Sequence, residues 1–171
     1  MRRSRRTVLG EDRANDLESA REAALALLER TRRTRADLRR RLREKGYADA
    51  TVGTVLDRLA QVGLIDDAEY ARAWLAGRWG RRMAGWRRLE ADLRRRGIAA
   101  EDVATARAAL EREQGGADEV AGARRAIAQA DRRYASLEPR VRRQRLYALL
   151  ARRGYDSDTI ERALKPARDL D

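Results

Sequence analysis

The segment Leu38-Arg39-Arg40-Arg41-Leu42-Arg43-Glu44-Lys45-Gly46-Tyr47 decides the fold, because its pattern occurs three times in the chain. Leucines four residues apart lie on one face of a helix, and a glycine four residues further on can adopt the left-handed conformation that ends the helix. The same spacing recurs from Leu89 to Gly97 and from Leu146 to Gly154. Agreement across three copies predicts a tandem repeat.

Each copy is expected to be the middle helix of a three-helix unit. In the first unit an apolar helical period begins at Leu17, Thr34 begins the second helix, and Asp49 caps the third. The predicted organisation is a disordered basic arm over residues 1–15, followed by repeats over 16–64, 65–115 and 116–171. Because such short units bury little alone and rest on their neighbours, the expected fold class is all-α, an elongated curved array of three tandem three-helix repeats.

The connection between the first two units is Gly63-Leu64-Ile65-Asp66-Asp67-Ala68-Glu69-Tyr70-Ala71. Its glycine can end one helix, and Asp66 with Glu69 can form a capping box that begins the next. Its two apolar residues predict a buried turn. The residues to which we assign structural roles are Gly46, Gly63, Leu64, Ile65, Asp66, Asp67, Tyr70, Gly97 and Gly154.

The composition limits the class of protein. Of the 171 residues 43% are hydrophobic and only 5% aromatic, with two prolines and neither Cys nor His. Disulfides, thiolate chemistry and His-ligated zinc are therefore excluded. No apolar run approaches the roughly 20 residues of a membrane span, and the N-terminus lacks the apolar stretch of a signal peptide. We expect a soluble cytoplasmic protein without a membrane partner.

The sequence gives catalysis little support. Neither a His nor a Cys is available as base or nucleophile, and no pair of carboxylates has surroundings that would shift its pKa. Asp66 and Asp67 are adjacent at a helix start, where carboxylates are helix caps far more often than metal ligands. We expect no enzyme, no cofactor and no bound metal.

The charge points to a polyanionic partner. The chain has 40 basic and 28 acidic residues, a net charge of +12, which favours nucleic acid or nucleoprotein, although a merely solvated surface is the alternative. The basic residues gather around the inward-facing leucines of each second helix and must point outward, where they suit a phosphate backbone unless nearby carboxylates neutralise them. The candidate contacts to DNA or to a protein–DNA filament are Arg35, Arg39, Arg40, Arg43, Lys45, Arg81, Arg82, Arg87, Arg88, Arg94, Arg95, Arg142, Arg145, Arg152 and Arg153.

The three tryptophans allow two interpretations. Trp74 lies on the apolar stripe of its helix and is expected in the core. Trp79 and Trp86 lie among arginines, and either stack on single-stranded bases at the surface or fill the joint between two units. The sequence leaves both interpretations open for this pair.

Three segments of the chain resemble the RecX family of regulators of the bacterial recombinase RecA. They are G-L-I-D-D-x-x-Y-A at 63–71, the R-x-x-L-R-x-x-L-x-x-K-G-Y type of segment at 35–47, and R-R-G-Y-x-x-x-x-I-x-x-A-L at 152–164. The resemblance covers about residues 20–167. It implies a curved all-helical protein of three tandem three-helix repeats that binds in the groove of the RecA–DNA filament. A departure is Gly85, which stands where the first repeat has the better helix cap Thr34.

The family resemblance also implies a function, namely inhibition of ATP hydrolysis, strand exchange and coprotease activity of RecA. The expected partners are the RecA filament and, weakly and in a salt-sensitive way, single- and double-stranded DNA; the chain is expected to be a monomer. An alternative is a DNA-binding module that acts without RecA, either indifferent to sequence or similar to a helix-turn-helix. A third possibility is a scaffold for another acidic protein.

Overall fold

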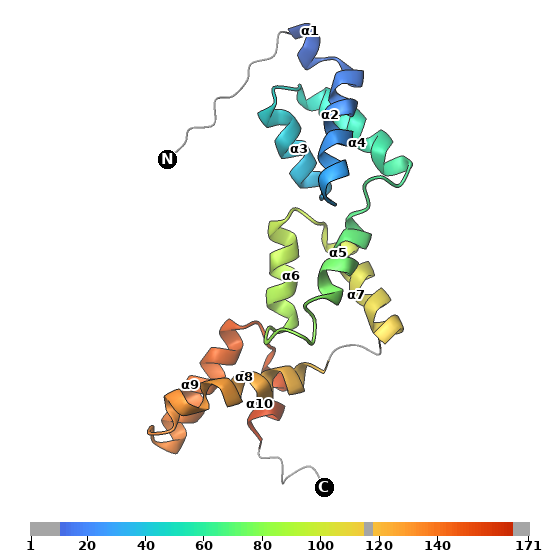
Figure 1. Cartoon of the computed structure of the whole chain (residues 1–171). Coiled ribbons are helices and arrows are strands. Elements are labelled where there is room, and N and C mark those ends of the chain that lie inside the picture. The colour runs from blue at the N-terminus through green and yellow to red at the C-terminus, as the bar shows by residue number, and fades with distance from the viewer. Residues whose placement is uncertain (1–10, 115–117, 166–171) are drawn as a thin grey trace. The chain divides into compact units, whose positions relative to one another are not determined.

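The computed structural model describes residues 11–114 and 118–165, and all regular structure in these residues is α-helical (Figure 1). No helix in this part of the chain combines the length and the apolar character that crossing a bilayer would require. The helices are α1 (Glu11–Ala14), α2 (Leu17–Arg30), α3 (Arg35–Glu44), α4 (Asp49–Gln61), α5 (Asp67–Ala76), α6 (Trp86–Arg95), α7 (Ala100–Gln114), α8 (Glu119–Tyr134), α9 (Pro139–Arg152) and α10 (Ser157–Leu164).

The helices form two compact units, which are described separately. One contains the described residues up to Ala71 together with Arg94–Asp102, and the other contains Arg72–Leu93 together with the described residues from Val103 onward. The second group of helices, α5 to α7, therefore contributes residues to both units.

In the first unit, α2, α3 and α4 pack on one another as a three-helix group (Figure 1). Leu38 and Leu42 are fully buried, and they share a core with Val52, Leu56 and Leu59. The leucine spacing therefore predicted the inward face of α3 correctly. Leucines of this size contribute about 1.5–3 kcal/mol each when they are fully buried.

Capping explains where these helices begin and end. Thr34 precedes α3 and accepts a hydrogen bond from the Asp37 amide at 3.1 Å, as expected. Gly46 and Gly63 have φ values of 102° and 73°, which few residues other than glycine tolerate. The expectation that Asp49 caps α4 was wrong, because Asp49 is the first helical residue and Ala48 occupies the cap position without a side-chain bond.

The connection into α5 confirms one half of the expected buried turn. Ile65 is only 6% exposed, whereas Leu64 is 52% exposed and lies outside the core. Asp66 accepts a hydrogen bond from the Glu69 amide at 2.8 Å, so the predicted helix start is confirmed.

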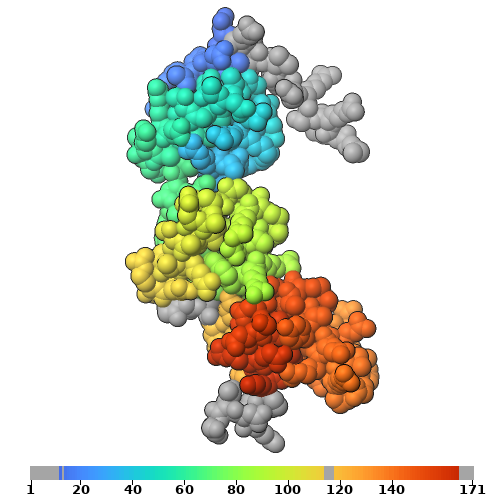
Figure 2. All heavy atoms as spheres, turned by 180° about the vertical axis from the view of Figure 1, so that it is seen from behind, coloured from blue at the N-terminus to red at the C-terminus, as the bar shows by residue number. Residues whose placement is uncertain are grey.

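The second unit holds α8, α9 and α10, which pack together around Leu150, Ile160 and Tyr155. Figure 2 shows their atoms as one continuous mass in orange and red. Helix α9 begins at Pro139, where Glu138 precedes it and accepts a hydrogen bond from the Val141 amide at 3.3 Å. Gly154, at φ 86°, follows α9 as Gly46 follows α3.

The start of the chain differs from the expected arm. Residues 1–10 of that arm lie outside the described residues. Residues 11–14, however, form the short helix α1, and the carbonyl oxygen of Ala14 accepts a hydrogen bond from the amide of Ala48 at 3.0 Å.

Candidate nucleic-acid interface

The second helix of each group places leucines inward and arginines outward, as the sequence predicted. Leu89 and Leu93 of α6 are 2% and 0% exposed, and Leu146 and Leu150 of α9 are 5% and 0% exposed. Most candidate basic residues on and beside these helices are exposed: Arg39, Arg40, Arg43, Lys45, Arg81, Arg82, Arg87, Arg88, Arg94, Arg95, Arg145 and Arg152. Arg35, Arg142 and Arg153 are half-buried.

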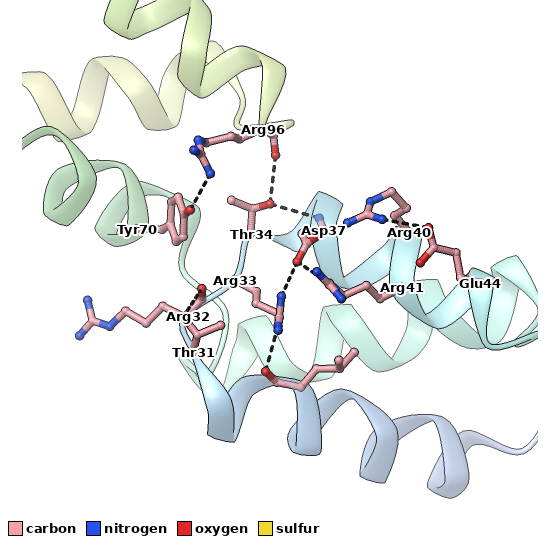
Figure 3. Close-up of polar contacts among 11 residues, drawn as sticks. Thr31, Arg32, Arg33, Thr34, Asp37, Arg40, Arg41, Glu44, Tyr70 and Arg96 are labelled. Atoms are coloured by element: carbon pink, nitrogen blue, oxygen red, sulfur yellow. Dashed lines mark hydrogen bonds and ion pairs between the residues drawn. The ribbon is translucent and has the colours of Figure 1, made fainter. Parts of the chain in front are cut away.

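Carboxylates neutralise much of the positive charge on α3. Asp37 accepts hydrogen bonds from Arg33 and Arg41, each at 2.9 Å, and also pairs with Arg40 (Figure 3). Arg40 in turn donates to Glu44 at 2.9 Å. One acidic side chain therefore gathers three guanidinium groups at the start of the helix.

The pKa of the Asp37 carboxyl reflects this cluster. Burial by itself would raise the pKa, but the hydrogen bonds from Arg41, Arg33 and Arg40 outweigh burial and lower the pKa to about 2. The Asp37 side chain is 26% exposed, so solvent screens these bonds only in part. The cluster thus stabilises the fold in addition to presenting charge.

Further pairs reduce the free charge of the candidate set. Arg35 pairs with Asp57, Arg43 pairs with Asp49 at 3.2 Å, and Arg142 of α9 pairs with Asp131. On α3, nearby carboxylates therefore neutralise much of the basic run, which is the condition under which the sequence disfavoured phosphate binding. The role of the candidate basic residues in binding remains a prediction.

The start of α3 is also where the first two repeats meet within the first unit. The Thr34 hydroxyl donates a hydrogen bond to the carbonyl oxygen of Arg96 at 3.0 Å, and the Arg35 amide donates to Asp67 Oδ1 at 2.9 Å. Gly97, at φ 78°, lies so close that an added Cβ would overlap Ala36. The Asp67 carboxylate thus caps a helix of the preceding repeat, and burial raises its pKa although the Arg35 amide opposes this.

Tyr70 takes part in the same contact. Its hydroxyl accepts a hydrogen bond from the Arg96 guanidinium at 3.3 Å (Figure 3). Asp67, Tyr70 and Gly97, to which we assign structural roles from the sequence, therefore all lie at the contact between the first two repeats.

A hollow of about 780 Å³ lies beside this contact, within the first unit. Arginines of α3, among them Arg39 and Arg43, line one part of it, and Glu101 and Asp102 line another. Burial and the neighbouring Glu101 and Asp66 raise the pKa of Asp102. Because both signs of charge are present, this hollow is a poor site for a simple polyanion.

The second unit repeats the contact with different residues. The Gly85 amide donates to the carbonyl oxygen of Arg153 at 2.9 Å, where the first unit uses the Thr34 hydroxyl. The Trp86 amide donates to Glu119 Oε1 at 3.2 Å, so Glu119 occupies the role of Asp67. A Cβ at Gly85 would overlap the backbone of Gly154, which gives a steric reason for the departure from threonine noted in the sequence.

The contact in the second unit settles the place of two tryptophans. The ring centroids of Trp79 and Trp86 lie 5.3 Å apart, and Trp79 Nε1 donates a hydrogen bond to Glu119 Oε1 at 3.1 Å. The guanidinium of Arg107 lies 4.4 Å from the Trp86 ring centre. Both tryptophans therefore fill a joint between repeats, one of the two interpretations that the sequence left open.

Trp74 is half-buried, so the expectation of a core position is met only in part. The Arg78 guanidinium stacks 4.3 Å from its ring centre and donates to the Trp74 carbonyl oxygen at 3.0 Å. Sequence reasoning missed Glu119 and Arg107 as contacts of the tryptophans, because they are distant in the sequence, Glu119 by 40 residues from Trp79, and leave no local signal. The contact of Arg78 with Trp74, four residues earlier, has a helical spacing but was not predicted either.

The described residues contain no group of three or more acidic side chains arranged to hold a metal ion.

Family models match the chain in the three places where the repeats lie. The first, second and third three-helix domains of RecX match residues 20–59, 66–106 and 117–164. The chain belongs to the RecX family. Relatives named regulatory protein RecX agree: that of Mycobacterium leprae (strain Br4923) is 42% identical over 84% of this chain and 82% of its own length. The regulatory protein RecX of Thermobifida fusca (strain YX) is 38% identical over 85% of this chain and 77% of its own length.

Solved RecX structures show the same fold. The crystal structure of RecX from Lactobacillus salivarius matches with a TM-score of 0.76 and 20% identity, over 88% of this chain and 96% of that one. A second crystal structure of a regulatory protein RecX also matches with a TM-score of 0.76 and 24% identity, over 86% of this chain and 70% of that one. The all-α fold of three three-helix domains is therefore confirmed, and the chain belongs to a family of regulatory proteins.

Proposed function

We propose that the chain regulates the RecA recombinase by binding the RecA–DNA filament and suppressing its ATP hydrolysis, strand exchange and coprotease activity. The observation that carries this proposal is membership of the RecX family, whose three domains match in order along the chain. The net charge of +12 supports a nucleoprotein partner.

The second helices support a mode of contact. They expose guanidinium groups in every repeat while their leucines hold the helices to the cores. Arginine suits this role because its planar fork binds phosphate or carboxylate oxygens in pairs. Contacts of this kind to DNA phosphates and to acidic RecA surfaces would hinder the subunit movements that hydrolysis and strand exchange require.

The setting of the proposal is the bacterial cytoplasm, where the chain would act as a monomer on an assembled filament. Binding to free DNA, single- or double-stranded, would be weak, indifferent to sequence and sensitive to salt, because phosphate contacts release counterions and read no bases. The chain would act without a cofactor and without a catalytic group of its own.

The alternative of a helix-turn-helix module receives less support. In such a motif the helix after the turn reads the major groove. Here that helix would be α4, which carries a single basic residue, Arg58, and two acidic ones, Asp49 and Asp57. The positive charge lies on the helix before the turn, so the charge distribution favours backbone contacts over base readout.

Cosedimentation separates these functions. In one sample the chain is mixed with RecA assembled on single-stranded DNA with a non-hydrolysable nucleotide, and the filament is pelleted. In parallel samples the chain is mixed with naked single-stranded or duplex DNA at the same nucleotide concentration and centrifuged in the same way. We expect the chain to pellet with the filament and to stay largely in the supernatant with naked DNA at physiological salt. Equal recovery on naked duplex would favour the DNA-binding module, and absence from both pellets would favour another acidic protein as partner.

A further inference from the structure

The connection between α5 and α6 differs from its counterparts in the other repeats. The first helices α2 and α8 contain 14 and 16 residues, whereas α5 contains 10 and ends before Gly77. Residues 77–85 then form a series of turns, with Gly80 at φ 71°. The connection holds Arg78, Arg81 and Arg82, so it presents cations where the other repeats continue a helix or turn directly.

These turns form part of a cup in the second unit, with a volume of about 550 Å³. Guanidinium groups line it from three places in the sequence, namely the turns, Arg88 of α6 and Arg153 after α9. One carboxylate, Asp92, lies in the lining. Pockets for small molecules measure about 300–1,000 Å³, so the cup is large enough for a nucleotide unit.

Charge is less compensated here than on α3. Arg81, Arg82 and Arg88 are exposed, and none of them forms an ion pair with a carboxylate of the described residues. On α3, by contrast, Asp37 alone gathers three arginines. An incoming anion at the cup therefore meets guanidinium groups that it need not detach from a carboxylate, which lowers the cost of binding.

Other members of the lining are held in place. Arg78 is fixed by its ring contact with Trp74 and by its bond to the Trp74 carbonyl oxygen. Arg153 is half-buried and donates to Gln129 at 3.5 Å. Gly154 packs directly on the backbone of Arg88, so the α6 and α9 parts of the lining are joined. Such fixed cations cost less entropy to order on binding than free ones.

The cup also has an apolar part, made by Met83, Ala84 and the Trp74 side chain. A thioether and an indole ring can contact the flat faces of bases, which a single strand exposes and a duplex keeps stacked inside. The combination of cations with an apolar wall suits a nucleotide unit better than a bare inorganic anion.

We infer that this cup binds the phosphodiester backbone of a single-stranded nucleic acid, with Arg81, Arg82 and Arg88 on the phosphates. The inference rests on the proposed function, because it names the part of the chain that would contact the DNA of the filament. It places that contact in the second repeat and not along the neutralised face of α3.

The test is a fluorescence-anisotropy titration of a labelled oligothymidylate without RecA. One variant combines Arg81→Ala, Arg82→Ala and Arg88→Ala. A matched control combines Arg58→Ala, Arg112→Ala and Arg132→Ala, which removes the same charge from exposed positions outside the cup. Circular dichroism melting verifies that both variants are folded. A further variant, Arg82→Lys with Arg88→Lys, keeps the charge but loses the two parallel N–H donors with which a guanidinium binds a phosphate.

We expect the cup variant to bind the oligonucleotide at least about tenfold more weakly, with the slope of log affinity against log salt reduced by about 2. The control is expected to change affinity less than about threefold. Equal weakening by both variants would overturn the inference. Displacement of the oligonucleotide by equimolar ATP or pyrophosphate would also overturn it, since the ligand would then be a free polyphosphate.

The outcome is separate from that of the proposed function. If the unaltered chain pellets with RecA filaments while the cup variant binds oligonucleotide normally, the inference fails and the proposed function stands. If the cup variant loses oligonucleotide binding while the unaltered chain does not pellet with RecA filaments, the inference about the cup stands and the proposed function fails.

Discussion

The hydroxyl of Thr34 donates to the carbonyl oxygen of Arg96, and 3.0 Å separates the two atoms. This bond joins the start of one repeat's second helix to the end of the next repeat's second helix. In the second unit the Gly85 amide makes the corresponding bond to Arg153. The contact between successive repeats is therefore made twice at corresponding positions, once by a side chain and once by the backbone.

Gly85→Ala tests the close approach in the second unit. The new methyl group would overlap the backbone of Gly154 and Tyr155, which cannot move without breaking their own packing. We expect a loss of about 1–3 kcal/mol in the free energy of unfolding, measured by urea denaturation.

Gly53→Ala is the matched control, because Gly53 lies inside α4 with only ordinary contacts for a Cβ. The greater helix propensity of alanine predicts a gain of up to about 1 kcal/mol. Equal effects of the two substitutions would show that the steric account of Gly85 is incorrect.

Thr34→Val tests the contact in the first unit. The substitution keeps the shape of the side chain but removes both the cap to the Asp37 amide and the bond to Arg96. We expect unfolding to become easier by about 1–2 kcal/mol. Thr54→Val removes an exposed hydroxyl that bonds within its own helix, so its effect should be under about 0.5 kcal/mol, and a similar loss in both variants would refute a special role for Thr34.

Asp37 predicts a dependence of stability on pH. Its pKa falls from 3.8 to about 2 on folding, so its stabilisation is fully present above pH 3.8 and is lost as the pH falls through 2. The shift corresponds to about 2 kcal/mol. Asp37→Asn should lower the free energy of unfolding by about this amount at pH 7 and by much less near pH 2, as urea denaturation at both pH values would reveal. A constant difference across this range would contradict the pKa assigned to Asp37.

Glu119 predicts the opposite sign. Burial raises its pKa above 4.5, with Trp79 and Trp86 opposing the rise, so its ionised form costs stability that is recovered as the pH falls through the raised pKa. The stability of the unaltered chain relative to Glu119→Gln should therefore decrease as the pH rises from about 4 to 7. Tryptophan fluorescence monitors unfolding at the same joint. A difference in stability between the unaltered chain and Glu119→Gln that stays constant across this pH range would exclude a buried carboxylate there.

The sequence predicted much of the fold but less of the site. Leu38, Gly46 and their counterparts recur with a fixed spacing, so the helices, their inward faces and the number of repeats could be inferred. The neutralisation of α3 is only partly local. Asp37 meets Arg40 and Arg41 at helical spacings that the sequence contains, although the prediction did not use them. Arg35 meets Asp57 and Arg43 meets Asp49 only after α4 folds back, and these pairs have no local signal. Likewise, the sequence shows that the second repeat has Gly85 where the first has Thr34. Only the close approach of the Gly154 backbone in the structure explains why a glycine stands there.

The central proposal is regulation of RecA, and its most direct test is the rate of ATP hydrolysis by RecA on single-stranded DNA as the chain is titrated in. We predict that the rate falls progressively and is strongly suppressed before the chain becomes equimolar with RecA. A rate that stays unchanged at equimolar chain, with the chain shown to be folded, would contradict the account.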